Sequence, residues 1–318
     1  MGGGPGRGHG PAVSAASGSL GRAAPGCDGP GRRGCLLSAG WPPLSLSESG
    51  KPLRHSLRLG PEATSVTCRE HPRFIEDYGP FQEITLSAAC PKANELLLGT
   101  RDPLTFSERQ DNQPTEDGDE WLDWLVPLRD RLLDLLRDRS RSLKARLRDF
   151  LLITGEAQQL LDSENMAELA AFCTGSLAIS AETNAGSGSW EAAACRCLQD
   201  LEILEPDWLA LLKQWEQAPE LPSFAPQDPE KLERIAVYFA FRYLLKAVND
   251  GDLLGRALFC VLGVLVTDRL SRFVGLPEAL RLFSREIEHN EDNLGTLLEQ
   301  FWQTEGLSLS ALLAAFGG

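Results

Sequence analysis

Apolar residues recur every three to four positions through most of this chain, and this period favours a fold made of helices packed on one another. The clearest stripe begins at Trp121 and continues through Leu125, Leu128, Leu132 and Leu136. Arginines lie among these residues, mostly on other faces of the predicted helix. A stripe of this kind turns one side of a helix towards a core and leaves the other side to solvent.

The same period predicts further helices on both sides of a proline-rich linker at residues 219–229. Asp228 followed by Pro229 is typical of a helix start, because aspartate caps free N–H groups and proline fits the first turn. Only residues 84–86 favour a strand. The predicted helices cover about residues 121–136, 143–161, 164–178 (with Ser163 as a candidate cap), 190–204, 207–217, 229–246, 252–273, 277–287, 294–304 and 307–316. We therefore predict a mainly α fold: a multi-helix domain with a small irregular cysteine-containing segment and a disordered N-terminus.

The first part of the chain has a different composition. Residues 1–60 hold 15 of the 30 glycines and 7 of the 20 prolines, and they show no helical or strand period. Such a composition is typical of disorder. The sequence thus divides into a disordered or out-of-family segment (1–58), a cysteine-containing segment (59–107), a helical domain (120–218) and a C-terminal helical domain (228–318).

Charge and composition exclude several classes of protein. The net charge is −14, and the only positively charged part is residues 1–66, with 7 Lys/Arg against 3 Asp/Glu. An acidic body argues against nucleic-acid binding, which needs clustered Lys and Arg. No apolar run is long enough for a membrane span, and the first 40 residues lack the pattern of a secretory signal. We therefore expect a cytoplasmic protein whose eight cysteines are reduced, as thiols or metal ligands.

Cys68, His71 and Cys90 have a spacing that allows metal binding. A thiolate and an imidazole three positions apart can reach one ion, and Cys90 is a third candidate ligand. The alternative is that both cysteines are buried thiols and that His71 caps a turn before Pro72. From spacing alone, the alternative is favoured.

Two parts of the sequence resemble the flagellin lysine-N-methylase family. The first comprises residues 67–74 (TCREHPRF) and 86–91 (LSAACP), and the second comprises residues 238–252 and 284–294 (SREIEHNEDNL). The resemblance covers about residues 59–301. It implies N-methylation of lysine side chains on flagellin, with S-adenosylmethionine as methyl donor and an iron–sulfur cluster held by cysteines.

By this resemblance, Cys68 and Cys90 correspond to cluster ligands. The family begins with a cysteine-rich segment containing a Cys-Cys pair, and this chain has no such pair. Two thiolates and one imidazole leave a cluster site at least one ligand short. We therefore expect weak iron binding and little methylase activity from this chain. The alternatives are a metal- or iron–sulfur-cluster protein without methylase activity, and an inactive remnant.

Glu286, Glu288 and His289 form a dense titratable group, and Arg242 is a charge within an apolar helix. Lysine methylation needs a neutral amine, so a carboxylate or imidazole near the substrate can hold the ammonium and accept its proton. Glu286, His289 and Arg242 are therefore the catalytic candidates. The alternatives are a solvated helical face for the acidic group and a structural salt bridge for Arg242.

Lys246 lies one helical turn after Arg242. Charges on an apolar helix are costly unless they are paired. Asp250 and Glu286 are the expected partners of these two basic residues.

Overall fold

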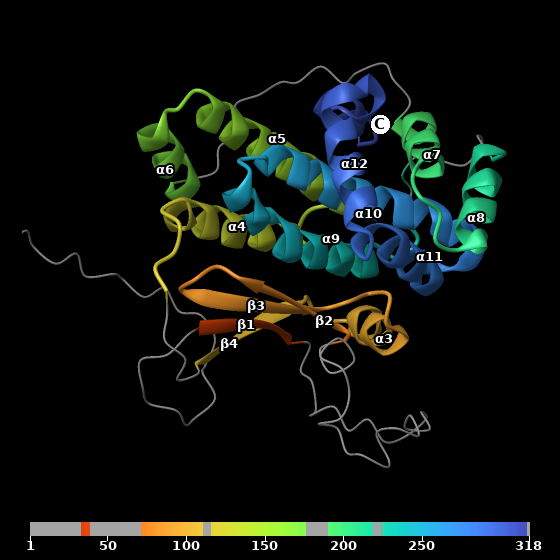
Figure 1. Ribbon diagram of the computed structural model, residues 1–318, viewed down its shortest axis with the longest axis horizontal. Helices are drawn as coiled ribbons and strands as arrows, with labels where there is room; N and C mark the ends of the chain where they lie inside the picture. Colours follow the sequence, from red (N-terminus) through yellow and green to blue (C-terminus); the bar gives the residue numbers. More distant parts are fainter. Residues whose placement is uncertain are drawn as a thin grey trace, which may run out of the picture.

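The protein is mainly α, with a small sheet lying beneath a layer of helices (Figure 1). This computed structural model describes residues 71–110, 116–175, 190–218, 224 and 226–316, together with the backbone of residues 33–38. Cys68 and most of residues 1–58 lie outside the described residues. None of the described helices combines the length and apolar character needed to cross a membrane.

The elements follow one another with short connections. The strands are β1 (Arg33–Ser38), β2 (Arg73–Asp77), β3 (Phe81–Leu86) and β4 (Thr105–Gln110). The α-helices are α3 (Pro91–Gly99), α4 (Leu122–Arg137), α5 (Leu143–Asp162), α6 (Met166–Thr174), α7 (Trp190–Asp200), α8 (Pro206–Glu216), α9 (Pro229–Tyr243), α10 (Leu253–Val274), α11 (Leu276–Phe283), α12 (Glu291–Gln303) and α13 (Leu309–Ala314). Short helical turns complete the chain: η2 (Leu244–Asn249), the π-helical η3 (Ser284–Glu288) and η4 (Glu305–Leu307).

The sheet has the strand order β2-β3-β1-β4, in which β1 runs parallel to β3 and the other pairs are antiparallel. The β2–β3 hairpin turns at Gly79, whose φ is +88°. A Cβ atom there would lie 2.8 Å from the backbone oxygen of Asp117. Glycine is therefore required at this turn by both conformation and space.

The helical expectations are confirmed in number and place from residue 121 onwards. Asp228 caps α9 as predicted, since its side chain accepts the N–H of Lys231 at 3.1 Å, and Pro229 is in the first turn. The cap of α6 differs from the prediction: Asn165 accepts the N–H of Glu168, while Ser163 ends α5. The missed helix α3 is short and follows Pro91.

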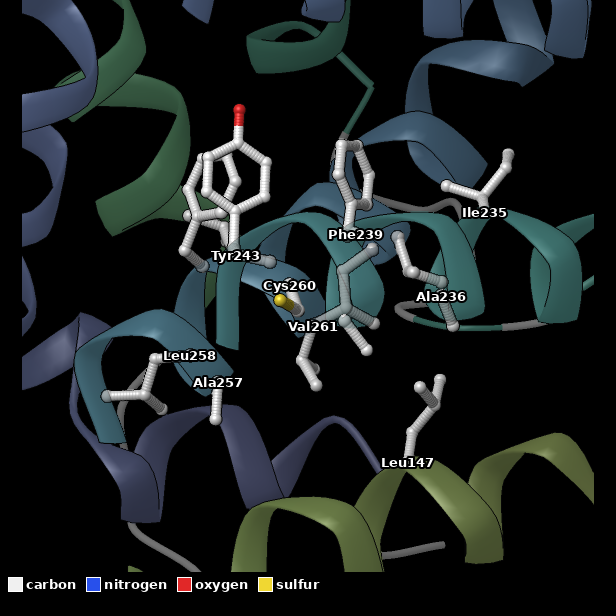
Figure 2. Packing of buried hydrophobic residues seen from close by; sticks show 14 of the residues in the cluster. Leu147, Ile235, Ala236, Phe239, Tyr243, Ala257, Leu258, Cys260 and Val261 are labelled. Carbon is white, nitrogen blue, oxygen red and sulfur yellow. The ribbon is translucent and has the colours of Figure 1, made fainter. Parts of the chain in front are cut away.

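The core is continuous between the two predicted helical segments. Helices α4 and α5 pack with α9 and α10, and buried residues of all four belong to one apolar cluster. Figure 2 shows Phe239 and Tyr243 of α9 facing the residues of α10. The ring of Phe239 meets that of Phe259 edge-on, with centroids 5.8 Å apart. The expected packing of α9 on α10 is thus confirmed.

The sheet is the main departure from the expectations. Only residues 84–86 favoured a strand, whereas four strands are present, and β1 lies within the segment expected to be disordered. In β3 the buried positions are Glu83 and Thr85, while Ile84 and Leu86 are only partly buried. The apolar alternation that marks a strand is therefore inverted, so the pattern could not identify it.

Buried polar residues of the sheet pair with arginines of the helical layer. Arg129 of α4 forms an ion pair with Glu83 and lies 4.7 Å from the centre of the Phe241 ring. Phe241 stacks on Phe106 of β4 with centroids 3.9 Å apart, and Arg137 lies 4.8 Å from the Phe106 ring. Desolvated cation–π contacts of this kind contribute about 2 kcal/mol each.

Candidate functional site

The end of strand β3 meets the end of η3 beneath the helical layer. Ser87 follows β3, and its hydroxyl lies 2.6 Å from Nε2 of His289, which is 202 positions away in sequence. The same hydroxyl accepts the N–H of Ala89 at 3.1 Å. Ser87 is buried, whereas His289 is exposed. The serine therefore fixes the orientation of an imidazole that solvent can reach.

A second histidine lies beside the first. The ring centroids of His71 and His289 are 6.5 Å apart, and Phe74 lies 4.9 Å from His289. The N–H of Ser87 donates to the carbonyl of Pro72 at 2.7 Å, which holds the start of β2 at the end of β3. Partial burial lowers the pKa of His289, so its imidazole is neutral at neutral pH.

Glu288, the residue before His289, points into the core. Its carboxylate accepts hydrogen bonds from the hydroxyls of Tyr238 (3.0 Å) and Tyr243 (3.1 Å) and faces Nε of Arg242 at 3.1 Å. Arg242 also donates to the Thr85 hydroxyl at 3.2 Å. Burial, reinforced by the charge of Glu288, raises the pKa of both tyrosines, so they remain protonated donors. The carboxylate is thus compensated on several sides.

Arg242 joins this network to the sheet. Its guanidinium carbon lies 3.2 Å from the centre of the Phe74 ring, the same ring that contacts His289. The side chain is almost wholly buried, so it does not face a substrate. Its expected partners were Asp250 and Glu286, and this expectation is wrong: the partner is Glu288.

The other charged residues of this region have structural partners. Lys246 pairs with Glu76 of β2, and Asp250 pairs with Arg256. Glu286 is fully buried and accepts the backbone N–H groups of Leu204 (2.9 Å) and Glu205 (2.8 Å).

These two N–H groups immediately precede helix α8. A carboxylate there stabilises the helix N-terminus, because free N–H groups and the helix dipole favour negative charge. Glu286 and Glu288 are therefore buried, and a solvated acidic face is not what these residues form.

The predicted metal ligands are only partly within the described structure. Cys90 is half-buried, caps α3, and donates its N–H to the carbonyl of Ser87 at 3.1 Å. His71 lies at the same end of the sheet, through Pro72 and Ser87, and Cys68 lies outside the described residues. Among the side chains that the structure describes, no three of His, Cys, Asp or Glu are grouped closely enough to hold a metal ion. Cys173 and Cys260 are buried, as expected for structural thiols.

Ser87, Tyr238 and Thr85 are site residues that sequence reasoning did not single out. The available signal was the run of polar residues at alternate positions, Glu83, Thr85 and Ser87, on one face of a strand. Polar residues on a buried face need partners. That requirement points to the helical residues that supply them.

Two surface hollows are separate from the histidines. One, of about 600 Å³, is lined partly by four carboxylate side chains, those of Asp117, Asp119, Glu120 and Asp123. The other, of about 450 Å³, is mostly apolar and includes Trp302. Neither is lined by a residue of the histidine site.

Comparison of the chain with models of protein families, with curated proteins and with solved structures found no match. The site must therefore be interpreted from its own chemistry and from the motifs in the sequence.

Proposed function

We propose that this chain is the helical body of a protein lysine N-methyltransferase acting on flagellin, and that His289 receives the substrate lysine. One observation supports the proposal above others. The two sequence segments that resemble the flagellin lysine-N-methylase family are far apart in the chain, yet they meet through Ser87, Phe74, Arg242 and His289.

Three of the candidate residues differ in what they can do. A lysine nitrogen attacks a methyl group only after its ammonium has lost a proton, and a neutral imidazole within reach can accept that proton. His289 is exposed and has a lowered pKa, so it meets both requirements. Arg242 and Glu286 are buried, and in this proposal they are positioning residues.

The cofactors implied by the resemblance enter no step of the proposal. An iron–sulfur cluster normally needs four thiolates. At this end of the sheet the described residues offer one thiol, Cys90, with the imidazoles of His71 and His289, and this donor set does not fit such a cluster. No described hollow adjoins His289 to receive S-adenosylmethionine. The proposal therefore concerns lysine binding and proton transfer by the chain itself.

The experiment is transfer of a tritiated methyl group from S-adenosylmethionine to flagellin by the full chain. We expect slow transfer to lysine, and we expect His289→Gln to reduce it by about 100-fold or more, the usual contribution of a general base. The matched control is His55→Ala, which should leave the rate unchanged. If the unaltered chain transfers no label to lysine, the proposal fails, and so it does if both variants lose the same activity.

A further inference from the structure

We propose that His71 and His289 form a binding site for one divalent transition-metal ion of the zinc and nickel type. The inference uses only the geometry of the two imidazoles and does not rest on methylation of flagellin. It also differs from an iron–sulfur cluster, because imidazole nitrogens suit mononuclear Zn²⁺, Ni²⁺ and Cu²⁺ ions.

The separation of the rings is close to what one ion requires. With a metal–nitrogen bond of about 2.1 Å, two imidazoles on a tetrahedral ion have centroids roughly 5 Å apart, and on a linear one roughly 6.5 Å. The observed separation is 6.5 Å, with the rings tilted by 43°. Both side chains are exposed, so rotation about their side-chain bonds can close the remaining distance of roughly 1 Å.

The donor atoms are available. Ser87 occupies Nε2 of His289, and the described residues offer no hydrogen-bond partner to its Nδ1 or to either ring nitrogen of His71. A hydrogen bond to the second nitrogen is the arrangement that orients metal-binding histidines and sets the nitrogen that binds. The lowered pKa of His289 keeps the lone pair free of a proton at neutral pH.

The surrounding charges allow a cation to approach. Arg242 is the nearest buried cation and is neutralised by Glu288. Arg285 is turned towards Glu205, with Nε and Oε1 2.6 Å apart. Phe74 forms an apolar wall beside His289 that limits access of water to one side. Two protein ligands leave the other positions of the ion to water or to a bound molecule, as in open metal sites.

The test is titration of the full chain with Ni²⁺ by calorimetry, and with Co²⁺ by absorption spectroscopy, under reducing conditions. We expect one ion per chain, and no thiolate-to-cobalt absorption band. His71→Ala and His289→Gln should each weaken binding at least tenfold. Ser87→Ala, which keeps both ligands but frees the ring, should weaken it by about tenfold, as loss of an outer-shell partner does.

The matched control is the double variant His9→Ala/His55→Ala, which removes the other two histidines of the chain and should bind as the unaltered protein does. Equal loss in this control would overturn the proposal, as would an intense thiolate band or the absence of saturable binding. His71 is exposed and lies before β2, so His71→Ala keeps the test decisive if a variant at His289 proves unstable. Because the titration contains neither flagellin nor methyl donor, its failure is distinct from failure of the methylation proposal.

Discussion

Two interfaces of this molecule are built in different ways. Between α9 and α10 the contacts are almost wholly apolar, and Phe239 meets Phe259 and Phe283 there. Between the sheet and the helical layer, buried charges are prominent, and the ion pair of Arg129 with Glu83 is the clearest example. Both interfaces are closed to solvent, but they depend on different physical terms.

The difference separates strength from specificity. Apolar burial has no preferred direction, and it contributes about 1.5–3 kcal/mol for a large side chain. A buried ion pair gains little over apolar residues of the same size, yet loss of one partner leaves a costly unpaired charge. We infer that the helix–helix interface supplies most of the stability, whereas the sheet–helix interface determines how the sheet is seated.

The largest effect is expected from Phe239→Asp, which places an unpaired carboxylate among three buried rings. The loss should exceed about 4 kcal/mol, because no partner for the charge is at hand. Circular dichroism should show no cooperative melting transition at the usual temperature. Phe239→Leu is the matched control, with a much smaller loss. A normal melting curve for Phe239→Asp would contradict the packing described for α9 and α10.

The second prediction concerns the charged interface. Glu83→Ala leaves Arg129 buried without its partner and should lower the free energy of unfolding by about 3–5 kcal/mol. The double variant Glu83→Leu/Arg129→Met removes both charges and should recover most of that loss. Urea denaturation of the three proteins measures the difference. If the double variant is as unstable as the single one, the pair stabilises the fold more than the comparison allows.

A smaller effect is expected from Tyr243→Phe, which removes one of the hydrogen bonds to Glu288. Bonds to a charged group contribute about 1.5–3 kcal/mol. Tyr238 and Arg242 remain as partners of the carboxylate, so the loss should lie at the lower end of that range. Equilibrium unfolding in urea measures it. A loss as large as that of Glu83→Ala would mean that the network depends on every member.

The smallest effect is the pH dependence due to His289. Its pKa is lower in the folded protein than in the unfolded chain, so the unfolded state binds more protons as the pH falls through about 6.5. Stability from this group is therefore complete above that pH and is lost below it. His289→Gln should lose slightly less stability between about pH 7 and pH 5 than the unaltered protein does. Parallel pH profiles for the two proteins would show that His289 does not contribute.

The helices were predictable because their evidence is local. The stripe at Leu125, Leu128 and Leu132 and the cap at Asp228 act within a few residues, and both appear where expected. The candidate site was predictable only as a set of segments. His71 and His289 were both identified as chemically notable, but nothing in a linear sequence relates positions more than 200 residues apart.

The sequence alone determined that this chain forms amphipathic and buried helices, because helical period and capping depend on near neighbours. Only the tertiary structure decided the fate of the charges. Glu286, Glu288 and His289 lie within one turn, yet the first anchors α8, the second binds Arg242 in the core, and the third reaches solvent beside His71. The physical reason is that the free energy of a charge depends on burial and on partners brought from elsewhere in the chain.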